Sequence, residues 1–149
     1  MSNDNHHPTS WLFLATFWRL RQRLGKLVSE KISAEFGCDL RAYIVVKFVQ
    51  NGVLFPGDLA EAMQIPAYMA SRLIEPLVER GLIERRFDPQ DARRTRLGLT
   101  ETGLTFVAAA DRLIEAELDV YLARLSPERR AMLVDLLVEL AGQGIPETE

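Results

Sequence analysis

Five arginines fall within the twelve residues from Arg85 to Arg96. The same stretch holds only two acids, Asp88 and Asp91, so its local charge is about +3, although the whole chain has a formal net charge of −3. A guanidinium grips phosphate with a planar fork, and arginine side chains also enter narrow minor grooves of DNA. The pattern therefore predicts phosphate binding; the alternative is a solvated surface whose arginines only face water.

The C-terminal part of the chain has the opposite charge. From Glu101 onward there are ten acids and four arginines, an excess of about six negative charges. Phosphate attraction depends on the local patch rather than on the total charge. A basic segment followed by acidic helices is thus compatible with nucleic acid binding at one end of the molecule.

Catalytic and metal chemistry lack a matching set of residues. The two histidines, His6 and His7, are adjacent in a polar tail, so no histidine lies in the region expected to fold and act as a base. No glycine-rich phosphate loop occurs either. We therefore predict neither an enzyme nor a cofactor, and two neighbouring histidines alone do not predict a metal site.

The single cysteine, Cys38, cannot form a disulfide within the chain, which favours a cytoplasmic location. Its alternatives are an oxidation sensor or a small, partly buried residue. The apolar run from Trp11 to Trp18 is too short to span a bilayer. The sequence therefore predicts no membrane segment, and residues 1–9 are expected to be a disordered tail.

The elements that would position the arginines follow from periodicity and capping. Leu20, Leu24, Val28, Ile32 and Phe36 recur every four residues, which predicts a helix from Ser10 to Gly37. Shorter helices are predicted from Asp39, from Pro56 to Met63, and from Ala67 to Arg80. Val53–Phe55, Leu82–Arg86 and Thr95–Leu99 are strand-like, and the last two would form a hairpin.

Two short helices followed by a hairpin predict a winged helix-turn-helix over residues 38–100. The fold class is therefore mainly α with a small β-hairpin wing. Thr100 would cap a helix reaching about Leu125, and Ser126-Pro127 would open a last one that buries Leu133, Leu136, Leu137 and Leu140. Residues 10–37 and 101–145 exceed what so small a lobe needs, so we predict that they form a helical homodimerisation region.

The residues after the predicted turn are similar to a known family. Asp58-Leu59-Ala60, Leu77 to Arg86, Asp88 to Arg94 and Leu99 to Gly103 resemble the MarR (multiple antibiotic resistance regulator) family of transcription factors. The match covers roughly residues 38–108, and its most specific part is the wing, with Asp91, Arg93 and Leu99-Thr100 at the spacing of the family.

The resemblance implies a homodimeric transcription regulator, expected to be a repressor, that binds a pseudo-palindromic operator in double-stranded DNA. The helix with Ser71 and Arg72 would enter the major groove, Arg93 would reach the minor groove, and Asp91 would orient the wing by pairing with an arginine. The residues expected to contact DNA are Ala67, Tyr68, Met69, Ser71, Arg72, Arg86, Arg93, Arg94 and Arg96.

Three departures bear on how DNA would be recognised. Tyr68, Met69 and Ala70 stand where the family usually has small polar residues, so fewer bidentate base contacts and more reliance on DNA shape are expected. Ala92 replaces the first arginine of the wing. Pro76 lies inside the predicted recognition helix, where it removes a hydrogen bond to the Arg72 carbonyl. We hypothesise that Pro76 bends this helix and re-aims its N-terminal half; the alternative is a tolerated irregularity.

Many members of the family release DNA on binding a small phenolic or anionic molecule. By that analogy Trp11, Trp18, Arg41 and Tyr43 could line an effector pocket, although an aromatic stripe is also typical of a dimer core. A second function class stays open, a winged-helix protein-interaction module with weak or no specific DNA binding. A steep loss of DNA affinity with salt would distinguish the regulator from such a module.

Overall fold

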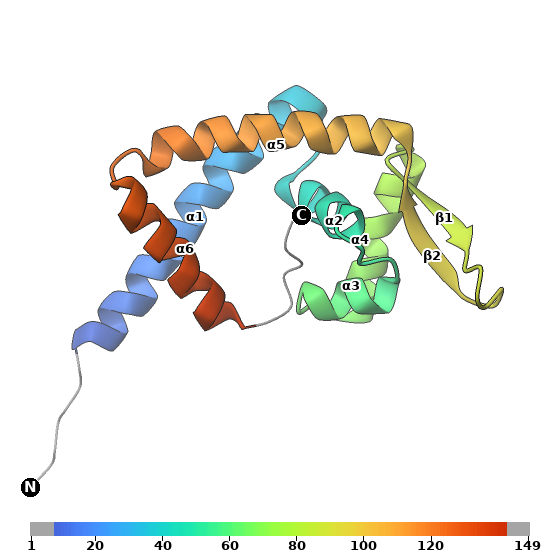
Figure 1. The fold of residues 1–149 in the computed structure, drawn as a ribbon, viewed down its shortest axis with the longest axis horizontal. Helices are drawn as coiled ribbons and strands as arrows, with labels where there is room; N and C mark the ends of the chain where they lie inside the picture. Colours follow the sequence, from blue (N-terminus) through green and yellow to red (C-terminus); the bar gives the residue numbers. More distant parts are fainter. Residues whose placement is uncertain (1–7, 143–149) are drawn as a thin grey trace, which may run out of the picture.

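The computed structural model describes residues 8–142, and in these it contains six helices and one antiparallel hairpin (Figure 1). The predicted fold class, mainly helical with a winged helix-turn-helix, is confirmed. In chain order the elements are α1 (Pro8–Phe36), α2 (Leu40–Gln50), α3 (Pro56–Ala62), α4 (Ala67–Glu79), β1 (Ile83–Phe87), β2 (Thr95–Leu99), α5 (Glu101–Leu122) and α6 (Pro127–Ala141).

One apolar core holds together the helix-turn-helix, the hairpin, the C-terminal third of α1 and the first half of α5. Its fully buried side chains come from seven elements, α1 to α5 with β1 and β2. Detaching any one of them would expose apolar surface to water. These side chains are Ile32, Val45, Val46, Leu59, Ile74, Ile83, Leu97 and Val107. No buried polar or charged residue is found among the described residues, and the core is therefore held by apolar packing.

The hairpin pairs Ile83 with Leu99, Arg85 with Leu97 and Phe87 with Thr95. These three pairs share one face of the ribbon, because strand side chains alternate. Ile83 and Leu97 on this face are buried in the core, which anchors the base of the wing. The opposite face carries Arg86 and Arg96 as a cross-strand pair.

The wing joins α5 through a tight set of hydrogen bonds at Thr100. Its hydroxyl donates to the Gly81 carbonyl at 2.5 Å and accepts the Gly103 N–H at 2.9 Å, so Thr100 caps α5 as predicted. Gly81, with φ +68°, turns the chain from α4 into β1. Gly103 lies so close to the Leu82 carbonyl that a Cβ there would collide with it.

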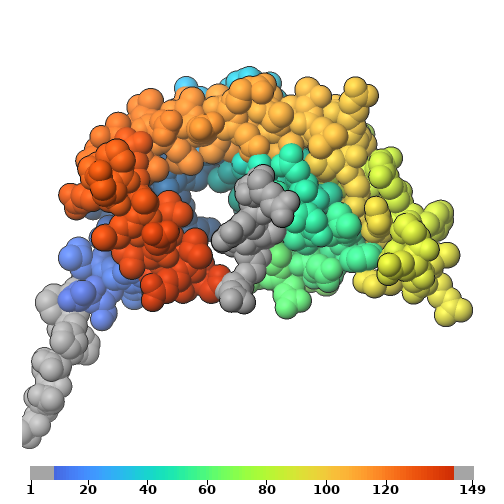
Figure 2. Space-filling view, in the orientation of Figure 1, coloured from blue at the N-terminus to red at the C-terminus, as the bar shows by residue number. Residues whose placement is uncertain are grey.

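Helix α5 runs across the molecule from the wing to α6 and packs on α1 and α2 (Figure 1). Phe36 of α1 meets Phe106 of α5 edge to face, with ring centroids 5.2 Å apart. The first half of α1 and all of α6 lie at the end of the molecule opposite the wing (Figures 1 and 2). Many large apolar side chains of this end are exposed, among them Trp11, Leu12, Phe13, Leu14, Phe17, Trp18, Met132, Val134, Leu136, Leu137, Val138 and Leu140.

Three expectations differ from the structure. Helix α1 begins at Pro8, two residues before Ser10, and of the expected tail only residues 8–9 are described. Val53–Phe55 is not a strand: it makes one backbone bond with the wing, from Leu97 N–H to the Leu54 carbonyl at 2.6 Å, too little for a ladder. No residue of α6 is buried in the single chain, because α6 projects past the core and finds no partner there.

Candidate nucleic-acid interface

Helix α4 presents one apolar and one polar face. Ala70, Ile74 and Leu77 are buried at helical spacing and fix the helix on the core. Ser71, Arg72 and Glu75 are exposed on the other side. The helix is therefore oriented by its own sequence pattern, with the residues predicted to meet DNA turned outward.

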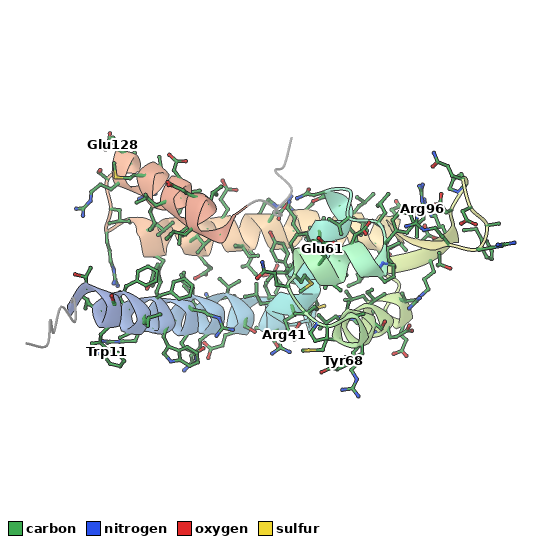
Figure 3. The ribbon with its side chains drawn as sticks, turned by 90° about the horizontal axis from the view of Figure 1, so that it is seen from below. Trp11, Arg41, Glu61, Tyr68, Arg96 and Glu128 are labelled. Carbon is green, nitrogen blue, oxygen red and sulfur yellow. The ribbon has the colours of Figure 1, made fainter. Side chains whose placement is uncertain are left out.

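The N-terminal turns of α4 hold the predicted base-contacting residues. Ala67 and Tyr68 are exposed, Tyr68 to 63%, whereas Met69 is half-buried. The Arg72 guanidinium lies 5.9 Å from the centre of the Tyr68 ring, within the range of a cation–π contact. Figure 3 shows Tyr68 and Arg96 on the half of the molecule away from Trp11 and Glu128. The exposed N-terminal part of α4 thus presents an aromatic ring and a cation, in place of small polar side chains.

Pro76 lies inside α4, and the helix continues through it to Glu79. The Arg80 N–H donates to the Pro76 carbonyl at 3.0 Å, so regular bonding resumes after the proline. The proposed bend and its effect on Tyr68 and Arg72 stay a prediction.

The five arginines of the wing are not equivalent. Arg85 pairs with Glu75 of α4, and Arg86 pairs with Glu84 on its own strand. The Arg94 guanidinium stacks on the Phe55 ring. Within residues 8–142, the side chains of Arg93 and Arg96 have no hydrogen-bond, ion-pair or ring partner. These two cations are the ones that the fold leaves available for phosphate.

Asp91 fastens the wing loop through the backbone. Its carboxylate accepts the Arg93 N–H at 3.0 Å, and its carbonyl accepts the Arg94 N–H at 2.9 Å. The described residues include no ion pair between Asp91 and an arginine, so the expected pairing is not present in this chain. An Asx turn orders the loop instead, because the short side chain reaches a backbone donor two residues on.

Sequence reasoning missed three residues of this surface. Glu75 neutralises Arg85, Phe55 lies under Arg94, and Phe87 is 79% exposed on β1. The partner of Arg85 lies ten residues away and that of Arg94 lies 39 residues away, so no local pattern relates them. The sequence offered one indication of such a contact: Phe55 stands at a helix-capping position that normally favours a small polar residue.

The residues proposed for an effector pocket do not converge. A pocket of about 630 Å³ opens between α1, the start of α2 and Leu137 of α6. Arg41 lines it, together with Arg21, Asp39 and apolar residues of α1, whereas Trp11, Trp18 and Tyr43 do not. Tyr43 is two residues beyond Arg41, about 200° around the helix, and Trp18 is about 100° from the lining residue Phe17.

Tyr43 instead belongs to a polar contact between α2 and α5. Its hydroxyl donates to one oxygen of Asp111 at 2.7 Å, and Lys47 Nζ donates to the other at 2.6 Å. Burial raises the pKa of the Tyr43 phenol well above its usual value, and the bond to Asp111 and the charge of that carboxylate raise it further. This contact links the helix-turn-helix lobe to the long helix.

The remaining candidates lie apart from this surface. Cys38 is buried, and burial raises the pKa of its thiol more than the nearby Arg80 lowers it. His6 and His7 lie outside the described residues. No group of histidine, cysteine and acidic residues in the described part could hold a metal ion. Among helices in residues 8–142, none is both long and apolar enough to cross a membrane.

Sequence comparisons relate this lobe to a family of transcription regulators. Residues 36–94 match the family model described as the MarR family. The chain is 25% identical over 120 residues to the uncharacterized HTH-type transcriptional regulator YdgJ of Bacillus subtilis, covering 80% of this chain and 73% of that protein. It is 33% identical over 93 residues to a Thauera aromatica protein named for regulation of the hcr operon, covering 62% and 56%. The chain thus spans just over half the length of the second relative.

Solved structures share the fold. The Staphylococcus aureus MepR–DNA complex superposes with a TM-score of 0.74 at 22% identity, over 87% of this chain and 96% of that one. An Escherichia coli MarR variant with operator DNA gives 0.78 at 19% identity, over 93% and 99%. The Streptomyces coelicolor regulator PcaV, with its natural ligand, gives 0.71 at 27% identity, over 95% and 96%.

Proposed function

The chain belongs to the MarR family of transcription regulators, and from this premise we propose that it is a homodimeric repressor of a pseudo-palindromic operator. The family is one of regulators rather than enzymes. The observation that carries the proposal is the juxtaposition of an outward-facing α4 with a wing whose Arg93 and Arg96 are unpaired within the described residues.

In this proposal α4 lies in the major groove and the wing meets the adjacent minor groove. Tyr68 would pack on a thymine methyl group, and Ser71 and Arg72 would reach base edges or phosphates. Arg93, at the tip of the wing, would enter the minor groove, whose negative potential attracts guanidinium groups. We propose a cytoplasmic location, which membership of a family of transcription regulators implies.

A second copy of the chain is the proposed occupant of the apolar end. Trp11 is 76% exposed and Leu140 is 69% exposed, and both helices that carry them project past the core. Exposed apolar patches of this kind mark interfaces in soluble proteins. Pairing α1 and α6 across a two-fold axis would bury them and direct the two wings toward two half-sites.

The pocket beside Arg41 is the proposed effector site. A lining of mostly apolar residues that also includes Arg21 and Arg41 suits a small aromatic carboxylate or phenolate. Because the pocket touches α1, α2 and α6, a bound molecule could bias how the lobe sits on the dimer. The effector site can be tested separately from DNA binding. A panel of such molecules is added to labelled operator bound by the wild type or by Arg41→Gln, and release of the operator is measured. Equal release from both proteins would argue against Arg41 as an effector ligand.

The test of DNA binding is fluorescence anisotropy on the DNA upstream of the chain's own gene, with scrambled DNA of equal length beside it. We expect specific binding that weakens steeply with salt and weakens again in Arg93→Ala. Arg124→Ala is the matched control, since it removes the same charge from the turn between α5 and α6, on the acidic part of the chain.

Equal binding of both DNAs, with no difference between Arg93→Ala and Arg124→Ala, would contradict an operator at that locus. Absence of DNA affinity at every moderate salt concentration would favour the alternative, a winged-helix protein-interaction module.

A further inference from the structure

We propose that Phe55 and Arg94 form a clamp that sets the position of the wing relative to α3 and α4. In this proposal Arg94 is a positioning residue, and its neighbour Arg93 is the arginine that meets DNA. The inference rests on the proposed DNA-binding function for its effect on affinity, but the clamp itself can be measured in the free protein.

Phe55 stands at the N-terminus of α3 but does not cap that helix. It is the N-cap of α3, a place that favours serine, threonine, aspartate or asparagine, whose oxygens accept a free N–H of the first turn. The Phe55 side chain makes no such bond. A phenyl ring has no oxygen that could accept a backbone N–H of the first turn. The interaction made by the Phe55 ring is therefore with another element of the fold.

That contact is Arg94. The central carbon of its guanidinium lies 3.9 Å from the centre of the Phe55 ring, the shortest of the four cation–ring distances among the described residues. A guanidinium at this distance over a ring is held by both electrostatic attraction and stacking. The two residues come from the start of the helix-turn-helix and from the far side of the wing loop.

The contact between Arg94 and Phe55 also restrains the wing loop, because the backbone of Arg94 is hydrogen-bonded within that loop. Its N–H donates to the Asp91 carbonyl, and its carbonyl accepts the Asp88 N–H, both at 2.9 Å. The loop between β1 and β2 is closed by these bonds. Holding the Arg94 side chain therefore holds the tip of the wing as a unit.

A second tie lies next to the first. The Leu97 N–H of β2 donates to the Leu54 carbonyl at 2.6 Å. Leu54 and Phe55 are adjacent, while Leu97 and Arg94 are three residues apart along the wing. One tie alone would leave the wing free to swing about it, whereas two ties at different distances from the tip remove that freedom.

The clamp gives two neighbouring arginines different roles: Arg93 contacts DNA and Arg94 positions the wing. Arg93 has no side-chain partner within residues 8–142, whereas Arg94 is stacked. Loss of the Arg93 charge should remove a phosphate contact and reduce the salt dependence of binding. Loss of the Phe55–Arg94 stack should weaken binding without changing the salt dependence, because no phosphate contact disappears.

The experiment compares Phe55→Leu, Phe55→Tyr, Arg94→Gln, Arg93→Gln and the Phe55→Leu/Arg94→Gln pair in the full-length protein. Affinity for the operator is measured over a range of salt, with hydroxyl-radical footprints on the same DNA. Hydrogen exchange of the Asp88 and Arg94 amides is measured without DNA, and thermal unfolding verifies that each variant is folded.

We expect Phe55→Leu and Arg94→Gln each to lower affinity about two- to fivefold at an unchanged salt slope, with the paired variant no worse than either alone. Footprint protection should fade in the flanking minor grooves and stay in the central major grooves. Exchange of the two wing amides should accelerate in both variants, and Phe55→Tyr, which keeps the ring, should behave as the wild type.

The proposal is overturned if Arg94→Gln reduces the salt slope as Arg93→Gln does while Phe55→Leu leaves affinity unchanged, because Arg94 would then be a phosphate ligand. It is also overturned if wing exchange in the free protein is the same in all variants. If the wild type binds no DNA but wing exchange responds to Phe55→Leu and Arg94→Gln, the proposed function fails and the clamp stands.

Discussion

Asp111 is the residue through which α5 holds α2. Its two carboxylate oxygens accept from Tyr43 and Lys47, and both contacts are shorter than 2.8 Å. Asp111 is 35% exposed and Lys47 is 23% exposed, so water screens the ion pair only in part. Asp111 thus adds a polar contact to the apolar packing between α2 and α5.

Asp111→Asn should lower the free energy of unfolding by about 1–2 kcal/mol, because the amide retains the shape but leaves Lys47 without a counter-charge. Urea unfolding measures this loss. Asp119→Asn is the control: its carboxylate is 69% exposed and 3.6 Å from Arg130, so a change below about 0.5 kcal/mol is expected. Equal losses in the two variants would argue against a structural role for Asp111.

The same substitution should change how Tyr43 titrates. The raised pKa means that the fold favours the neutral phenol, so this stabilisation is complete below about pH 10 and is lost as the pH rises toward the folded-state pKa. Asp111→Asn removes the carboxylate's share and should lower the pKa of Tyr43 toward its usual value. Absorbance at 295 nm, with Tyr43→Phe subtracted, isolates this group, and an unchanged midpoint would contradict the assignment.

Gly103 is the residue that allows the first turn of α5 to approach Leu82, just before β1. A Cβ at this position would collide with the Leu82 carbonyl, which is backbone and cannot move aside cheaply. Gly103→Ala should therefore destabilise the protein by roughly 3 kcal/mol, measured by urea unfolding. Gly25→Ala is the opposite case: nothing lies within 4 Å, so alanine in the middle of α1 should stabilise by up to about 1 kcal/mol. Similar effects at the two sites would be inconsistent with this packing.

At the residue scale, sequence reasoning found the arginines of the wing but not their partners. Arg85, Arg86 and Arg94 are engaged by Glu75, Glu84 and Phe55. Which partner an arginine selects depends on the distance between elements, and this follows from tertiary packing rather than from spacing along the chain. Local charge therefore overestimates the number of free cations on this surface.

Helix α4 carries a proline that should be removable. In Pro76→Ala the new N–H can donate to the Arg72 carbonyl, so we expect stability to rise by up to about 3 kcal/mol, seen as a higher midpoint in urea. If Pro76 bends α4, operator affinity should change at the same time, because Tyr68 and Arg72 would be re-aimed. A gain in stability at unchanged affinity would remove the functional part of the hypothesis.

Capping and periodicity predicted most elements well. Asp39, Thr100 and Ser126 each accept a backbone N–H of the helix that follows, and β2 has the predicted bounds. These elements are determined by short-range hydrogen bonds and by an apolar stripe. Val53–Phe55 was predicted as a strand and is not one, because a strand needs a partner along its length and this segment meets β2 at a single bond.

The whole molecule is expected to bind DNA as a pair of chains, and Leu140→Glu tests this. A buried carboxylate at the apolar end should dissociate the dimer, which sedimentation equilibrium would detect. Gln50→Glu adds the same charge at the exposed end of α2 and should leave the dimer intact. A Leu140→Glu protein that sediments as the wild type does would place the interface elsewhere.

The same pair of proteins measures the stoichiometry of DNA binding. In a dimer, Arg93→Ala removes two phosphate contacts, so the log–log salt slope should fall by about 1.8. In the Leu140→Glu background each bound chain loses one contact, and the fall should be about 0.9. Equal reductions in the two backgrounds would contradict binding as a dimer.

The length of α5 has a consequence for the spacing of the operator. It is one uninterrupted helix of 22 residues, about 33 Å long, fixed to the wing by Thr100 at one end and followed by α6 at the other. A continuous helix of this kind cannot lengthen by the rise of one base pair. Nor can it twist through the angle that a base pair inserted between the half-sites would add. In the proposed dimer α5 would therefore hold each wing at a fixed distance from the dimer contact, and inserting a base pair between the half-sites should weaken binding.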